Sequence, residues 1–398
     1  MTPRRARGRC RVLLTLALSA LTSATLAAQV EHVHAPAATT TWTWSWDTRI
    51  FAGWNYQRRK FRDFQEIESQ NWFMGSGERQ LLGGPFRVHA MLSLEPFTIQ
   101  PLGSPQVFQT GETYRQAPLI DYQHPHDLFM GLSMRWMRAI GTSRVFAEAA
   151  PVGSPAIGPP AFMHRPSAAE NLQAPLSHHN LDATHITPGV VAVGLEWNGF
   201  KVEGGAFHGR EPDEDRLDLD TSKLDSYGAR LSWADGPWQL QVSGADLTTP
   251  ERLSPYDATR VTASVLYFRG DENRSTAWMA AFGQNREIFG TLEAYLVEIT
   301  RRFSKHALFM RAENVEKDIL DAGFHPIGVA HTHRPSRISA LTAGYVRNVV
   351  SREWGTFGIG GDVTGYLVAG NLRESYGSPV SFHAFVRYRG RFGAMHVH

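Results

Sequence analysis

The feature that most constrains this chain is a repeated alternation of apolar and polar residues, without any apolar run after Leu21 that approaches 18 residues. Successive side chains of a strand point to opposite faces, so such segments predict strands with one apolar and one polar face. Two clear examples lie at 306–316 and 380–391. Segments of about ten residues are typical of outer-membrane barrels, whereas strands of soluble sandwiches or solenoids are usually nearer five or six. We therefore expect an all-β, closed antiparallel transmembrane barrel.

Sixteen segments follow this pattern, and we predict one strand from each. Fourteen strands remain an alternative, because the first two, among 42–80, are the least clear. The predicted strands are 48–57, 71–80, 86–95, 127–140, 144–151, 188–197, 200–209, 225–234, 237–247, 259–269, 276–285, 292–303, 306–316, 337–350, 354–367 and 380–391.

The connections between these segments alternate between short and long. Asn198-Gly199 and Asp235-Gly236 accept positive φ and are typical of tight hairpins. Short periplasmic turns that alternate with long external loops are characteristic of outer-membrane barrels. Loops beyond about 15 residues are uncommon unless functional, so we expect the long ones to fold partly into the lumen. The long connections are 96–126, 152–187, 210–224 and 317–336.

The N-terminus predicts an exported protein. Residues 1–11 carry five Arg and no acid, residues 12–21 are apolar, and small residues follow near Ala28; this is the pattern of a cleaved secretory signal peptide over 1–28. Its removal takes away Cys10, which excludes disulfides and Cys-ligated metals in the mature chain. It also leaves 35 basic against 38 acidic residues, a net charge of −3, so bulk charge argues against nucleic-acid binding.

The predicted organisation is one barrel with short flanking segments. After the signal peptide we expect a short segment at 29–47, the barrel at 48–392 and a His-containing tail at 393–398. The tail departs from the aromatic residue that usually ends such barrels. We expect the cell outer membrane as the location.

Histidines gather in the predicted loops: nine of the 17 lie in three of them, including His325, His331 and His333. Imidazoles beside Met and carboxylate suit copper, zinc or nickel. The alternative is that they only hydrogen-bond the loops together, since these spacings are unspecific. The acidic stretch 211–220 lacks the Gly and Glu of an EF-hand loop, so we expect a solvated face there, with loose surface binding of divalent cations as the alternative. The candidate metal ligands are His124, His126, Asp127, Met163, His164, His178, His179 and His185.

Charged residues at inward positions are the candidate pore lining. Arg387 and Arg389 form a basic stripe on the last strand, and Arg311, Glu313 and Glu293 are expected across from it. Inward charges of both signs suit a wet lumen with a transverse field. The alternative is that they pair with one another and only stabilise the wall.

Enzyme motifs are absent from the sequence. There is no Gly-x-Ser-x-Gly elbow and no Gly-rich nucleotide loop after a strand. A hydrolase is the third hypothesis only. Its acid–base residues would be Asp121 with the His124–Asp127 segment, or Ser177 beside His178. We predict a protein that is no enzyme and requires no cofactor, with a divalent or copper ion as an optional ligand.

Several loop segments resemble those of an uncharacterised group of bacterial proteins predicted to be outer-membrane β-barrels. The resemblance runs from about Trp72 to the end, and His-Pro-His-Asp is its most specific part. It implies the barrel fold and an association with heavy-metal handling, copper included. The similar segments are 109–114, 121–127, 158–165, 175–185 and 207–214.

The sequence thus predicts a porin-like channel for passive passage of small solutes or ions, constricted by His-rich loops. A barrel of 16 strands encloses an aqueous lumen unless something fills it. The alternative function is an outer-membrane protein that handles copper or zinc. Expected partners are outer-membrane lipid and small solutes or metal ions, with no nucleic acid. The sequence leaves open whether the chain forms a homo-oligomer.

Overall fold

The computed structural model describes residues 40–220, 223–252, 256–288, 290–317, 320 and 335–393. The predicted signal peptide, the tail beyond Gly393 and three candidate histidines (His325, His331 and His333) lie outside the described residues. Within the described part, no helix is long and apolar enough to cross a membrane.

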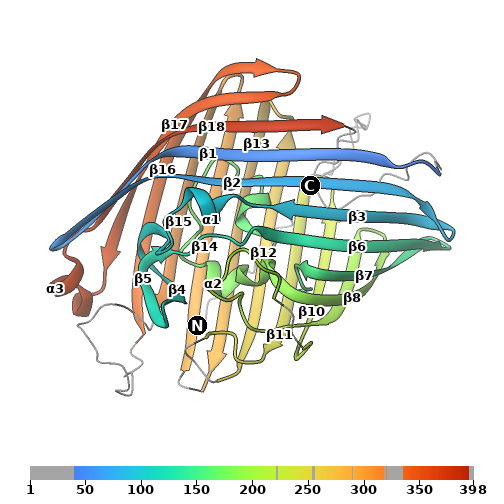
Figure 1. The fold of residues 1–398 in the computed structure, drawn as a ribbon, viewed down its shortest axis with the longest axis horizontal. Helices are drawn as coiled ribbons and strands as arrows, with labels where there is room; N and C mark the ends of the chain where they lie inside the picture. Colours follow the sequence, from blue (N-terminus) through green and yellow to red (C-terminus); the bar gives the residue numbers. More distant parts are fainter. Residues whose placement is uncertain are drawn as a thin grey trace, which may run out of the picture.

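Sixteen strands form a closed antiparallel barrel, in which the first and last strands pair and complete the circle. The predicted fold and strand number are confirmed, and each predicted strand overlaps one observed strand. Figure 1 shows the strands of one wall crossing those of the opposite wall at a steep angle, as the tilt of closed barrels requires. The barrel strands are β1 (Thr43–Arg59), β2 (Arg62–Leu81), β3 (Gly84–Leu92), β6 (Phe129–Ile140), β7 (Ser143–Gly153), β8 (Thr187–Trp197), β9 (Phe200–Phe207), β10 (Ser226–Asp235), β11 (Trp238–Leu247), β12 (Ala258–Gly270), β13 (Arg274–Glu287), β14 (Gly290–Phe303), β15 (His306–Lys317), β16 (Ser336–Arg352), β17 (Gly355–Val368) and β18 (Val380–Gly393).

The two faces of the strands have the predicted character. On β15, Leu308 and Met310 are about half exposed on the outer face, whereas Phe309, Arg311 and Glu313 are buried inside. The same division holds along β18. The outer face is therefore apolar, whereas the inner face carries charged side chains together with apolar ones that pack into buried clusters.

The two ends of the barrel differ. One end, the turn end, carries short connections such as Asn198-Gly199, where φ is +47° and +81°. A Cβ at Gly199 would lie 2.4 Å from the carbonyl oxygen of Ala234, so this hairpin requires glycine. The other end, the loop end, carries the long connections that follow β3, β7, β9 and β15.

The first hairpin is longer than predicted. β1 and β2 extend to a tight turn at Lys60-Phe61 at the loop end. Polar side chains of the stretch 58–70 bind an interior loop: Glu68 accepts a hydrogen bond from Ser104 (2.7 Å), and Arg59 pairs with Asp121 (3.0 Å). The alternation therefore weakens there although the strands continue.

Long loops fold into the barrel, as expected. The β3–β6 connection forms α1 (Glu95–Thr98) and a two-stranded sheet of β4 (Ser104–Tyr114) and β5 (Ala117–Gln123). The β7–β8 connection, residues 154–186, forms η1 (Phe162–His164), α2 (His178–Leu181) and η2 (Ala183–His185). Contacts of α2 with β12, β13 and β14, and of β4 with β1 and β2, place both loops inside the wall. The β17–β18 connection forms η3 (Gly370–Leu372) and α3 (Arg373–Tyr376).

Candidate functional site

The 154–186 loop is held across the lumen by a buried arginine. Arg165 has no exposed surface; its Nε donates to Glu298 Oε1 of β14 at 2.7 Å, and Nη1 donates to Asp182 Oδ2 at 2.6 Å. Ser167 donates a further hydrogen bond to Glu298 (2.8 Å). This network joins both halves of the loop to the barrel wall.

A second anchor is the fully buried Glu170, which lies among three arginines of the wall. Arg302 donates to it at 3.0 Å, Arg387 forms a close ion pair with it, and Arg389 lies 4.0 Å away. Burial alone would raise the pKa of Glu170, but the arginines lower it to about 2. The carboxylate is therefore ionised at any physiological pH.

The four predicted pore-lining residues all point inward, and the loop covers them. Arg311 donates to Glu298 (3.3 Å) and to the carbonyl of Gln173 (2.8 Å). Glu313 accepts hydrogen bonds from the backbone and the hydroxyl of Ser177, at 3.0 and 2.9 Å. Together with Arg387 and Arg389 they bind the loop, so at these positions the charges are paired. The expectation for Glu293 was wrong, because this side chain lies on the outer face of β14 together with Tyr295. Glu293 accepts a hydrogen bond from the hydroxyl of Tyr295 (3.1 Å).

Five of the predicted metal ligands lie together, and we call them the imidazole cluster: His124, His126, His178, His179 and His185. Neighbouring ring centroids are 6.2 Å apart for His124 and His126, 5.5 Å for His126 and His185, 5.1 Å for His185 and His178, and 5.5 Å for His178 and His179. Phe162 packs against three of these rings. His126 and His185, which are 59 positions apart in the chain, thus meet inside the barrel.

The Nδ1 atoms of all five cluster members have acceptors: His124 contacts the carbonyl of Pro125 (2.9 Å), and His179 contacts Glu211 (3.1 Å). His126 contacts Glu95 (2.8 Å), His178 contacts Asp182 (2.8 Å), and His185 contacts the carbonyl of Asp182 (2.9 Å). In a neutral ring such an acceptor places the proton on Nδ1 and leaves a lone pair on Nε2. At His126, however, Glu95 raises the pKa although burial acts in the opposite direction, which favours the charged ring with both nitrogens protonated. Within the described part of the chain, the buried Nε2 atoms of His126 and His185 have no hydrogen-bond partner.

Burial keeps three of these rings neutral at pH 7, and it lowers the pKa of His179 to about 4. It lowers the pKa of His178 to about 4, although Asp182 acts in the opposite direction. It also lowers the pKa of His185 well below its usual range, and the neighbouring imidazoles lower it further. Neutral imidazole is the form that binds a metal ion or accepts a proton.

The other predicted ligands are not part of this cluster. Asp127 forms an ion pair with Arg216 (3.0 Å), and burial raises its pKa to about 6. Met163 is buried in an apolar cluster with Phe162. His164 lines a cavity next to the loop.

Two carboxylates that sequence reasoning missed lie at His179. Its Nδ1 is 3.1 Å from Glu211 Oε1 and 3.8 Å from Glu251 Oε1. Burial raises the pKa of Glu211 to about 7 and of Glu251 to about 8; repulsion from Glu112 adds to the shift at Glu211, and repulsion from Glu211 adds to the shift at Glu251. The expected solvated face is therefore wrong at Glu211, whose side chain is only 10% exposed. The predicted loop 210–224 did contain Glu211, but nothing in the sequence pointed to Glu251.

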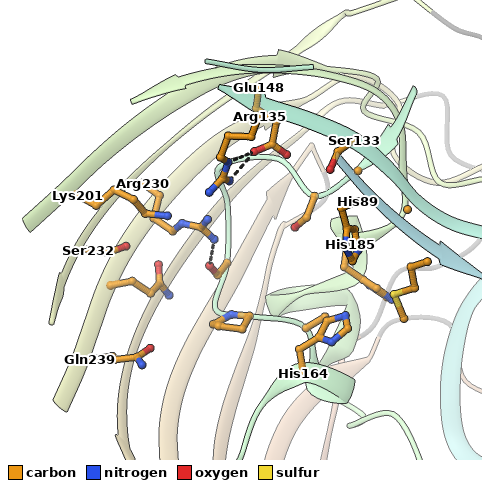
Figure 2. Close-up of a pocket in the computed structure, with 18 of the residues that line it drawn as sticks. His89, Ser133, Arg135, Glu148, His164, His185, Lys201, Arg230, Ser232 and Gln239 are labelled. Atoms are coloured by element: carbon orange, nitrogen blue, oxygen red, sulfur yellow. Dashed lines mark hydrogen bonds and ion pairs between the residues drawn. The ribbon is translucent and has the colours of Figure 1, made fainter. Parts of the chain in front are cut away.

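A cavity of about 350 Å³ lies in the lumen beneath the 154–186 loop, toward the turn end. Figure 2 shows Arg135, Glu148, Lys201 and Arg230 on its wall and His164 and His185 on its loop side. The wall charges are paired: Arg135 with Glu148 at 2.5 Å, and both Lys201 and Arg230 with Glu203 at 2.9 Å. Arg230 also donates to the carbonyl of Gly158 (2.8 Å), which ties the loop to the cavity wall.

The interior is much tighter among the loops themselves. Two cavities there measure about 20 Å³ each, little more than the roughly 10–15 Å³ that one water requires. Among the described residues, these two spaces between the loops are thus far smaller than the cavity beneath them.

The residues of the hydrolase hypothesis are engaged in other contacts. The hydroxyl of Ser177 donates to Glu313. Asp121 pairs with Arg59 (3.0 Å) and accepts the backbone N–H of Phe108 (2.8 Å). These hydrogen bonds hold the interior loops in place.

No family model and no curated protein matches the chain. Among solved structures, OprB of Pseudomonas putida is similar, with 11% identity, a TM-score of 0.51, and coverage of 88% of this chain and 94% of that one. A loop-deletion mutant of OmpT, an outer membrane protein of Vibrio cholerae, has 9% identity, a TM-score of 0.50, and coverage of 87% and 99%. An anion-selective porin from Comamonas acidovorans has 10% identity, a TM-score of 0.48, and coverage of 88% and 99%. At such low identity the likeness shows the fold, a closed barrel shared with outer-membrane proteins.

Proposed function

We propose that the chain is an exported outer-membrane protein that passes small solutes or ions through a lumen narrowed by its own His-containing loops. The observation that supports the channel function is the cavity of about 350 Å³ with its charged wall. Such a wall replaces part of the hydration of a polar solute, and the narrow loop region selects by size and charge.

The outer surface supports a position in lipid. Apolar side chains are about half exposed at mid-strand positions such as Val297, Leu341 and Val386. Aromatic side chains gather close to the turn end: Trp238 packs on Tyr267 and Trp278, and Trp354 packs on Phe357 and Tyr388. In membrane barrels, an outer apolar band contacts the lipid, and aromatic residues lie where the lipid meets water.

The substitution Val297→Arg tests whether the outer surface of the barrel lies in lipid. In lipid, an arginine at the middle of a barrel strand costs about 2–4 kcal/mol of unfolding free energy. On a water-exposed strand the same change would be nearly neutral. The measurement is urea unfolding of the protein folded into lipid vesicles. Leu217→Arg is the control, because Leu217 is similarly exposed but lies in a loop-end connection. Equal, small effects of the two changes would remove the support for a lipid-facing wall.

The channel itself is tested by recording the refolded protein in a planar bilayer. We expect discrete, stable current steps that are smaller than those of an unobstructed 16-stranded barrel, because the loops occupy most of the cross-section. Silence from protein shown to be folded and inserted would contradict the proposal and favour a purely structural plug.

A second candidate function is metal handling at the outer membrane, and the imidazole cluster supports it. Each of its five rings has Nδ1 next to an acceptor. That is the arrangement in which histidine ligands are usually oriented. Two of these rings have a buried Nε2 without a hydrogen-bond partner among the described residues.

A further inference from the structure

We propose that His179, Glu211 and Glu251 bind a divalent transition-metal ion at the loop end of the barrel. The three side chains come from three different connections and meet only in the fold. The inference goes beyond the channel, because the ion binds there whether or not the lumen conducts. It also names a ligand set that differs from the one expected from the sequence.

The spacing of the three ligand atoms suits one ion. His179 Nδ1 lies 3.1 Å from Glu211 Oε1 and 3.8 Å from Glu251 Oε1, and all three ligand atoms lie within 4.8 Å of one another. Zinc bonds to nitrogen and carboxylate oxygen measure about 2.0–2.2 Å, so tetrahedral ligand atoms are about 3.3–3.6 Å apart. An ion placed between the three atoms needs only small shifts of the side chains.

An unpaired carboxylate oxygen is an independent indication of a missing ligand. Glu211 is nine-tenths buried, yet its Oε2 is buried without a hydrogen-bond partner within the described part of the chain. A buried acceptor left unsatisfied costs about 1–3 kcal/mol, and more when it is charged. A cation at this position would satisfy that oxygen.

The surrounding charges leave the two carboxylates only partly compensated. Arg260 and Lys317 act on the site from β12 and β15, and Arg216 and His124 act from the interior loops. Glu112 and Glu287 add negative charge. A divalent ion would offset the repulsion between Glu211 and Glu251 directly.

The protein backbone fixes the orientation of the imidazole. A Cβ at Gly111 of β4 would lie 2.1 Å from Cε1 and 2.2 Å from Nε2 of His179, so that edge of the ring packs against bare backbone. Nδ1, which lies 2.8 Å from the same Cβ position, faces the carboxylates. The main chain of His179 is held as well, because Asn285 of β13 donates to its carbonyl at 3.0 Å. Glu251 keeps 30% of its side chain exposed, which gives an ion access from solvent.

The ligand chemistry narrows the choice of ion. One imidazole nitrogen and two carboxylate oxygens, without sulfur, suit borderline divalent ions such as zinc, cobalt, nickel and manganese. Three protein ligands leave coordination positions for water.

The experiment titrates Zn²⁺ and Co²⁺ into the full-length chain folded in detergent micelles. We expect one tight Zn²⁺ per chain, and visible absorption of bound Co²⁺ that reports nitrogen and oxygen ligands. Glu211→Gln and Glu251→Gln should each weaken Zn²⁺ binding by more than the roughly 10- to 100-fold that loss of a ligand's hydrogen-bond partner costs. Circular dichroism checks that each variant is folded.

Two controls locate the ion. Asp218→Asn alters the exposed acidic group of Asp213, Asp218 and Asp220 and should leave the affinity unchanged. The double variant His126→Ala and His185→Ala removes the two unpaired Nε2 atoms and should also retain the tight Zn²⁺. The proposal is wrong if wild-type protein binds no Zn²⁺ tightly, if Asp218→Asn weakens binding as much as Glu211→Gln does, or if only the double histidine variant loses the ion. Bilayer current from the same preparations reports the channel separately.

Discussion

Glu298→Ala is expected to lower the free energy of unfolding by about 3–5 kcal/mol, the cost typical of breaking a buried ion pair from one side. Glu298 binds both Arg165 and Arg311, at 2.7 and 3.3 Å, and all three side chains are buried. The change leaves two guanidinium groups inside the barrel without their shared carboxylate. Urea unfolding in lipid vesicles measures the loss.

The same change should alter the current. Arg165 is the residue that joins both halves of the 154–186 loop to β14, so its release loosens the loop across the lumen. We expect a larger and noisier conductance in planar bilayers than for the wild-type protein.

Glu78→Ala is the matched control. Glu78 is also a buried inward carboxylate, but its partner Arg87 (3.2 Å) lies on the adjacent strand β3. This change should destabilise the wall without releasing the loop. If Glu298→Ala raises the conductance no more than Glu78→Ala does, the loop is not held as we describe.

The barrel was predictable because its pattern is local. Alternation places Leu308 and Met310 outside and Arg311 inside without knowledge of any partner. Asn198-Gly199 marks a hairpin through its own positive φ. Errors arose where an inward side chain is polar because a distant loop binds it, as in the stretch 58–70, where Glu68 accepts a hydrogen bond from Ser104.

The contacts that hold the loops were not predictable in the same way. Arg165 and Glu298 are 133 residues apart, and each is an ordinary polar residue in its own segment. The sequence could show that Arg387 and Arg389 point inward. It could not show that the carboxylate of Glu170, 217 residues before Arg387, faces these arginines in place of water.

The metal-ligand prediction illustrates the same division. Residue type and loop position were enough to select five histidines that the fold brings together. The two carboxylates at His179 were missed because Glu211 lies in an acidic stretch that resembles a solvated face. Glu251 follows Pro250 in a separate connection, and only the closure of the barrel brings that connection close to His179.

Gly283→Ala is expected to displace α2 and thereby to affect both proposed activities. A Cβ at Gly283, on the inner face of β13, would lie 2.3 Å from the carbonyl oxygen of Asn180 and 2.9 Å from its carbon. Backbone atoms cannot rotate away as a flexible side chain does, so α2 must shift as a unit. Overpacking of this kind costs about 1–3 kcal/mol. Since α2 carries His178 and His179, we expect weaker Zn²⁺ binding together with a changed single-channel conductance.

Gly131→Ala separates this effect from the general cost of replacing an inward glycine. Gly131 lines the large cavity on β6, and a Cβ there would meet Met91 at 3.4 Å, an ordinary contact distance. That variant should keep the wild-type Zn²⁺ affinity. If Gly283→Ala also keeps it, α2 does not depend on backbone contact with β13, and the position of His179 must come from Gly111 and Asn285 alone. If conductance and Zn²⁺ affinity change together only in Gly283→Ala, one short helix couples the ion site to the constriction.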